Sequence, residues 1–132
     1  MLSVAGRCWI VIAVIHVIVG IATYLPQWQE IAQAGWFNVV APDPSAPIFD
    51  REDAFWFMML TPFLLLLGQL CFWADTQKLT LPISVSRILL ASTVIGIFFM
   101  PISGFWLVLI PTVMMLYSSQ TTEPSVTGSP TS

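Results

Sequence analysis

Residues 8–25, CWIVIAVIHVIVGIATYL, constrain the fold most, because they form an uncharged apolar run with one ionisable side chain, His16, near its middle. Three more apolar blocks follow, at about residues 54–73, 83–101 and 104–117. The first three blocks approach the ~20 residues that a helix needs to cross the ~30 Å hydrocarbon core of a bilayer. The fourth is shorter and crosses only where it stands nearly upright or the bilayer thins.

The blocks are continuous rather than alternating, which disfavours membrane-spanning strands. The sequence therefore predicts an all-α fold, a four-transmembrane-helix bundle. Composition supports this class, since 57% of the 132 residues are hydrophobic and 8% are charged, and the mean hydropathy is +0.86. About a quarter of the residues of a soluble domain are charged.

Charge and cysteine content exclude several kinds of site. The formal net charge is −3 and the four basic residues are scattered, so no affinity for nucleic acid or anionic lipid is expected. Cys8 and Cys71 have neither CxxC spacing nor nearby histidine ligands, which argues against a zinc or haem site. No glycine-rich phosphate loop or di-acidic motif occurs, so we expect no cofactor and no bound metal.

The chain is expected to form a single membrane domain over residues 1–117. Pro26 is expected to end the first helix. In residues 27–40, apolar side chains recur at three- and four-residue steps, which predicts a short amphipathic helix on the outer membrane surface; an ordinary loop with two anchoring tryptophans is the alternative. Residues 118–132 are rich in Ser, Thr and Pro and are expected to be a disordered polar tail.

The basic residues predict the orientation. Arg7, Lys78 and Arg87 would share one side of the membrane, and Arg51 would lie on the other. By the positive-inside rule, this bias places the N- and C-termini in the cytoplasm of a multi-pass protein of the bacterial inner membrane.

An alternative reading of the N-terminus is a signal peptide cleaved after Ala22, because an arginine and an apolar run precede a small-x-small sequence. One face of the first helix argues against cleavage. Small residues gather on it and would allow close packing against another helix. This stripe consists of Gly6, Ala13, His16, Gly20 and Thr23.

His16 is expected near the middle of the membrane, where ionisable side chains are functional hypotheses by default. Polar or helix-breaking residues at matching depth are candidates for a ligand cavity; they are Thr61, Pro62, Ser92, Thr93, Pro111 and Thr112. Three interpretations stay open: His16 holds helices together by bonding to Thr61, Ser92, Thr93 or Thr112, it belongs to a ligand or catalytic site, or it lies on a proton path.

If the site is catalytic, His16 would donate or accept the proton, and Glu52 or Asp53 would be a more remote acid. Both acids begin the second helix, several turns above His16, so a direct hydrogen-bonded dyad is not expected. The structural interpretation is that these acids complement the positive end of the helix dipole, with Asp50 as the cap.

Three strings carry a resemblance to a known family: IHVIVGI in the first helix, REDAFWFMML entering the second, and FFMPISGFWLVLIP joining the third to the fourth. Over residues 6–117 the chain resembles an uncharacterised family of small bacterial four-helix membrane proteins, which is more loosely similar to the DoxX-like group. The resemblance implies an integral membrane fold and brings no agreed activity or cofactor.

We therefore expect a small inner-membrane protein that acts as a binding or assembly component. Its expected partners are the lipid bilayer and either further copies of the chain or another membrane subunit. One alternative is a membrane-embedded acid–base enzyme, an isomerase or cyclase, that uses His16 on a lipophilic small molecule. A further alternative is a small proton-coupled carrier.

Overall fold

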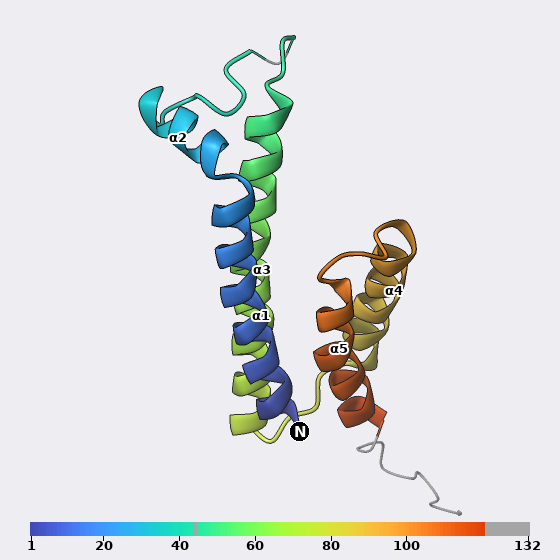
Figure 1. Cartoon of the computed structure of the whole chain (residues 1–132). Helices are drawn as coiled ribbons and strands as arrows, with labels where there is room; N and C mark the ends of the chain where they lie inside the picture. The colour runs from blue at the N-terminus through green and yellow to red at the C-terminus, as the bar shows by residue number, and fades with distance from the viewer. Residues whose placement is uncertain (44, 121–132) are drawn as a thin grey trace, which may run out of the picture. The chain divides into compact units, whose positions relative to one another are not determined.

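The computed structural model describes residues 1–43 and 45–120, which contain five helices and no strand. The helices, shown in Figure 1, are α1 (Leu2–Thr23), α2 (Leu25–Gln33), α3 (Phe49–Thr76), α4 (Ile83–Phe99) and α5 (Phe105–Gln120). The all-α prediction is confirmed. The chain divides into two compact units, one formed by Trp9–Gln69 and the other by Met1–Cys8 together with the chain from Leu70 onward.

The helices do not stop where the apolar blocks stop. α1 has 22 residues and α3 has 28, and both are long and apolar enough to cross a membrane. α3 continues through polar ends, residues 49–53 and 74–76, that hydropathy alone left out of the predicted span 54–73. α4 and α5 have 17 and 16 residues and fall below that length. α5 also continues through residues 118–120, which were expected to belong to the tail; residues 121–132 lie outside the described chain.

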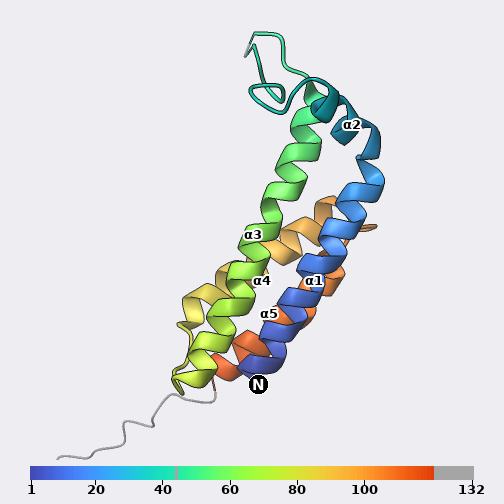
Figure 2. The ribbon, with the colours of Figure 1, turned by 90° about the vertical axis from the view of Figure 1, so that its left-hand side faces the viewer.

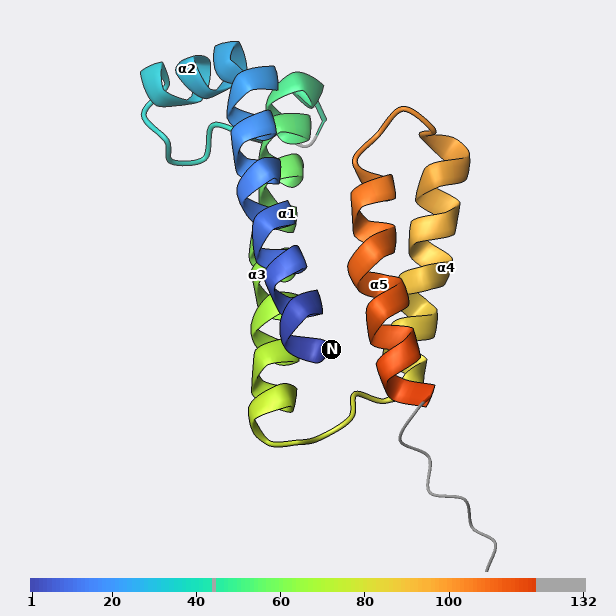
Figure 3. The same ribbon diagram turned by 60° about the horizontal axis from the view of Figure 1, so that its bottom comes forward.

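In the unit Trp9–Gln69, α1 and α3 lie side by side and antiparallel, as Figures 1, 2 and 3 all show. Gly20 permits their close approach. A Cβ atom at Gly20 would lie 2.5 Å from Sδ of Met58 and 3.0 Å from the Phe57 ring. Within the expected small-residue stripe, Gly6, Ala13 and Gly20 are buried, His16 is half-buried and Thr23 is exposed.

The joint between α1 and α2 places Pro26 at the start of α2 rather than at the end of α1. Helical hydrogen bonds continue through the joint, from the Tyr24 amide to the Gly20 carbonyl (3.1 Å) and from the Trp28 amide to the Tyr24 carbonyl (3.0 Å). Pro26 occupies one of the first two helical positions, where a helix does not need the N–H that proline lacks. α2 has nine residues, Leu25–Gln33. It begins two residues before the predicted segment 27–40 and ends at residue 33 of it.

α2 ends in a Schellman motif, a helix terminus closed by a residue in the left-handed conformation. Gly35 has φ +94° and donates its amide to the Ala32 carbonyl (3.2 Å), while the Trp36 amide reaches the Ile31 carbonyl (3.2 Å). The end of α3 repeats this geometry, with Lys78 at φ +54° and the Leu79 amide bonded to the Ala74 carbonyl (2.9 Å).

α4 and α5 pack together as an antiparallel hairpin (Figure 3). At its open end, the Ser86 and Ser119 hydroxyls are 3.5 Å apart and buried, and Ser119 also donates to the Leu81 carbonyl (3.0 Å). At the turn, a Cβ atom at Gly96 would lie 2.6 Å from the Phe105 ring. Small side chains at both ends therefore bring the two backbones close together.

Candidate functional site

His16 is engaged by the main chain of α3. Its Nε2 lies 2.7 Å from the carbonyl oxygen of Phe57. Its imidazole ring stacks on the Phe57 ring, with centroids 4.0 Å apart and planes 9° apart, and Tyr24 touches the Phe57 ring at a 5.5 Å centroid separation. Thr61, the candidate hydrogen-bond partner within the same unit, makes no bond to His16, whose Nε2 bonds to this main-chain carbonyl instead.

This hydrogen bond defines the tautomer of His16. A carbonyl oxygen only accepts, so Nε2 carries the proton and donates it. In the neutral ring, Nδ1 then carries the lone pair and is the atom that could accept a proton. His16 is therefore a structural donor at one nitrogen and retains one basic nitrogen for chemistry.

Thr61 and Pro62 lie on α3 within one or two turns of Phe57. Thr61 is half-buried, and its Oγ1 is buried without a hydrogen-bond partner among residues 1–43 and 45–120. Pro62 lies inside α3 and its ring is exposed. Its missing N–H leaves the Met58 carbonyl without the usual helical donor.

The two candidate acids lie in the first turns of α3. Asp50 and Glu52 belong to its first turn. The helix begins on Ile48, whose carbonyl accepts the amides of Arg51 and Glu52, so Asp50 is not the cap. Asp53 is four residues from Phe57, which is about 6 Å of axial rise in a helix. Asp53 is thus about one turn along α3 from the residue that His16 contacts, and its side chain is exposed.

The remaining candidates belong to the α4–α5 hairpin. Ser92 is exposed, whereas Thr93, Pro111 and Thr112 are buried. Thr93 Oγ1 donates to the Leu89 carbonyl (2.7 Å), and Thr112 Oγ1 donates to the Val108 carbonyl (2.8 Å). Each hydroxyl is therefore satisfied within its own helix.

The hairpin register brings two of these candidates to one level. Thr93 and Thr112 are each seven residues from a member of the Ser86–Ser119 pair. In an antiparallel hairpin, equal steps from one contact lead to a second pair of opposed positions. Thr93 and Thr112 thus lie at matching height within the hairpin.

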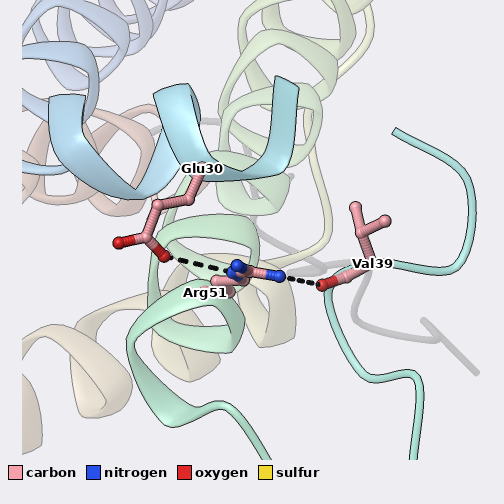
Figure 4. A network of polar contacts seen from close by, with 3 residues as sticks. All are labelled: Glu30, Val39 and Arg51. Carbon is pink, nitrogen blue, oxygen red and sulfur yellow. Dashed lines mark hydrogen bonds and ion pairs between the residues drawn. The ribbon is translucent and has the colours of Figure 1, made fainter. Parts of the chain in front are cut away.

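The sequence did not predict the role of Arg51. This α3 residue links its helix to α2 and to the loop that follows α2. Its Nε donates to Glu30 Oε2 (3.2 Å) in an ion pair, and its Nη1 donates to the Val39 carbonyl (3.1 Å), as Figure 4 shows. The Arg51 side chain is 20% exposed and Glu30 is 57% exposed. The opposite charges of Glu30 and Arg51 were the available signal. The two residues are 21 positions apart, however, and that spacing does not predict that they meet.

Among the described residues, no group of three or more His, Cys, Asp or Glu side chains is arranged to hold a metal ion. The model of a family described as a family of unknown function (DUF6463) matches residues 2–122. No curated protein and no solved structure matches the chain.

Proposed function

We propose, from the premise that the chain belongs to the family of unknown function DUF6463, that it is a multi-pass membrane protein acting as a binding or assembly component. An uncharacterised family was expected, and it brings no activity with it. The proposal therefore rests on one observation about the chain itself. His16, the polar group in the middle of α1, donates a hydrogen bond from Nε2 to the Phe57 carbonyl of the α3 main chain and stacks on the Phe57 ring. This engagement supports a role in holding helices together.

The exposed surfaces of α1 and α3 support insertion in a membrane. In their most apolar 18-residue stretches, 28% of α1 and 22% of α3 is buried, whereas the core helix of a soluble protein is mostly buried. Large apolar side chains such as Ile18 (61% exposed) and Leu66 (63% exposed) point away from the protein. Lipid is the environment in which such side chains are stable.

We extend the proposal to four spans. At 1.5 Å per residue, α4 and α5 would cover about 25 Å and 24 Å, so the hairpin crosses the bilayer where it thins locally. The basic residues favour a bacterial inner membrane with both termini in the cytoplasm. The looser likeness to DoxX-like proteins agrees with this layout.

Cysteine accessibility in intact cells tests the topology. The native Cys8 and Cys71 are replaced by serine, and single cysteines replace the exposed residues Ser45, Gln77 and Ile102. A membrane-impermeant maleimide is expected to label positions 45 and 102 from outside, and position 77 only after permeabilisation. Labelling of position 102 from the same side as position 77 would show that the hairpin does not cross.

Native mass spectrometry of the detergent-purified protein tests the assembly role. We expect an oligomer or a complex with another membrane subunit, because the apolar stretches of α1 and α3 are mostly exposed. His16→Phe keeps the aromatic stacking and removes the hydrogen bond, and it is expected to change the stability or size of this assembly. A monomer that is indifferent to His16→Phe would contradict the proposal.

One observation favours the enzyme as a second candidate. Asp53 lies about one helical turn from Phe57, and His16 Nδ1 carries the ring's lone pair, so an acid and a base occur in one part of the α1–α3 pair. The substrate would be a lipophilic small molecule. Mass spectrometry of organic extracts tests this candidate: a small molecule that co-purifies with the wild type and is lost in His16→Asn supports it. Identical extracts from both proteins would remove it.

A further inference from the structure

Thr61 presents a buried hydroxyl that lacks a partner among residues 1–43 and 45–120. A buried hydroxyl without a hydrogen bond has lost its contact with water and gained nothing in return, so it destabilises the folded protein. A helical threonine donates to the carbonyl three or four residues earlier, and Thr61 makes neither bond. The carbonyl four residues earlier is that of Phe57, which accepts a hydrogen bond from His16 Nε2 at 2.7 Å.

Two other threonines in this chain show what Thr61 would otherwise do. Thr93 donates to the Leu89 carbonyl at 2.7 Å, and Thr112 donates to the Val108 carbonyl at 2.8 Å. Both acceptors are four residues earlier in the same helix. Thr61 is thus a threonine in an α-helix whose usual acceptor is occupied from another helix.

The number of lone pairs explains the conflict. A carbonyl oxygen has two lone pairs. In a regular helix, the Phe57 carbonyl gives one of them to the Thr61 amide, and His16 takes the other. The Thr61 hydroxyl would be a third donor on an oxygen that accepts two.

We propose that His16 and Thr61 compete for the Phe57 carbonyl, and that this exchange makes residues 61–62 a hinge whose state depends on the docking of α1. With α1 docked, His16 occupies the carbonyl and Thr61 is left without a partner. With α1 displaced, Thr61 takes the carbonyl, as Thr93 and Thr112 do. The inference does not depend on the proposed function.

Pro62 on α3 and Gly20 on α1 explain why this exchange would act as a hinge. Pro62 removes one helical hydrogen bond and kinks helices, and a threonine bonded to the carbonyl four residues earlier bends a helix further. Gly20 fits tightly against Phe57 and Met58, so a change in the bend of α3 disturbs its contact with α1. Docking of α1 and the bend of α3 are therefore coupled through one carbonyl.

Thermal unfolding of the purified protein tests the competition. The test is whether Thr61→Val raises or lowers Tm in each of two backgrounds. In the wild type, Thr61→Val removes an unpartnered hydroxyl and is expected to raise Tm by about 2–5 °C. In the His16→Phe background, the Thr61 hydroxyl donates to the Phe57 carbonyl. Thr61→Val removes this hydrogen bond there and is expected to lower Tm by a similar amount. The same sign in both backgrounds would overturn the proposal.

Thr93→Val is the matched control, because Thr93 is bonded to its own helix whatever occupies position 16. It is expected to lower Tm in both backgrounds. Should His16→Phe fail to fold, His16→Leu provides the second background, because leucine also has no hydrogen-bond donor. A Thr93→Val effect that also changed sign would show that residue 16 acts on the whole protein rather than on the Phe57 carbonyl, and would likewise overturn the proposal.

Distances along α3 test the hinge directly. Spin labels are placed at cysteines replacing the exposed Asp53 and Trp73, on opposite sides of Pro62, with Cys8 and Cys71 replaced by serine. His16→Phe is expected to shift the distance between the labels, and adding Thr61→Val is expected to return it to the wild-type value. An unchanged distance in His16→Phe would refute the hinge.

Discussion

Gly20→Ala tests the contact that sets the spacing of α1 and α3. The new Cβ atom would lie 2.5 Å from Met58 Sδ and 3.0 Å from two atoms of the Phe57 ring. Met58 is flexible and can turn aside, but the Phe57 ring contacts the rings of both His16 and Tyr24. The substitution must therefore displace the ring that His16 stacks on.

The magnitude follows from two opposing effects. Overpacking a well-packed contact costs about 1–3 kcal/mol. Replacing a mid-helix glycine with alanine recovers up to about 1 kcal/mol of helix propensity. We expect a net loss of about 1 kcal/mol, which corresponds to roughly a five-fold fall in the ratio of folded to unfolded protein.

Unfolding in mixed micelles with increasing SDS, followed by tryptophan fluorescence, measures this loss. The chain contains one histidine, so ¹⁵N-histidine labelling of a protein without a histidine tag reports the His16 ring alone. The wild type is expected to show a protonated Nε2, and Gly20→Ala is expected to shift both ring signals.

Gly104→Ala is the control, because no atom lies within 4 Å of the position its Cβ would take; its stability is expected to stay within about 0.5 kcal/mol of the wild type. Met58→Ala should relieve part of the Gly20→Ala loss, since it removes the atom nearest to the new methyl group. Wild-type stability and unchanged histidine signals in Gly20→Ala would refute the proposed close contact.

Three further predictions concern the helix ends and the loop. Lys78→Gly is expected to stabilise α3 by about 0.5–1 kcal/mol in the same unfolding assay, because glycine adopts the left-handed conformation without a Cβ penalty; a loss of stability would contradict the Schellman geometry. Glu30→Gln is expected to have little effect on cleavage of the 34–47 loop by added protease, since the Glu30 side chain is 57% exposed and ion pairs open to solvent contribute little. Arg51→Gln also loses the hydrogen bond to the Val39 carbonyl and should speed cleavage. Equal cleavage rates in the two variants would refute this role of Arg51. The side-chain and amide hydrogen bonds from Ser45 to Asp43 lower the pKa of that carboxyl below 3.8. These bonds are therefore present above this pH and are lost as pH falls through the lowered pKa. A Ser45 amide NMR titration with a midpoint at or above 3.8 would contradict this.

The helices could be predicted from the sequence because apolar blocks, prolines and turn residues mark them locally. Their lengths could not, since α1 starts at Leu2 and α3 extends to Thr76 through residues whose hydropathy says nothing about helix formation. The joint at Tyr24 was misread for a related reason. Proline interrupts a helix when it is internal and starts one when it lies in the first turn, and the sequence does not distinguish the two.

The candidate site could be predicted in part. His16 was recognisable as the polar residue of the first apolar run, but its acceptor is a main-chain carbonyl, which every residue carries and no sequence pattern marks. The same is true of the Val39 carbonyl that accepts from Arg51. Arg51 was interpreted only as a charge on the outer side, because its pairing with Glu30 depends on where α2 folds back.

The separation of His16 and Phe57 along the chain has a consequence for biosynthesis. The donor and the acceptor are 41 residues apart, and a ribosome adding 5–20 residues per second needs about 2–8 s to synthesise that interval. In the hairpin, Gly96 and Phe105 are nine residues apart, so that contact can close almost as soon as it is made. α1 therefore passes through a stage of several seconds in which the imidazole has no partner from α3, and a chaperone or insertion factor would meet the chain in that interval.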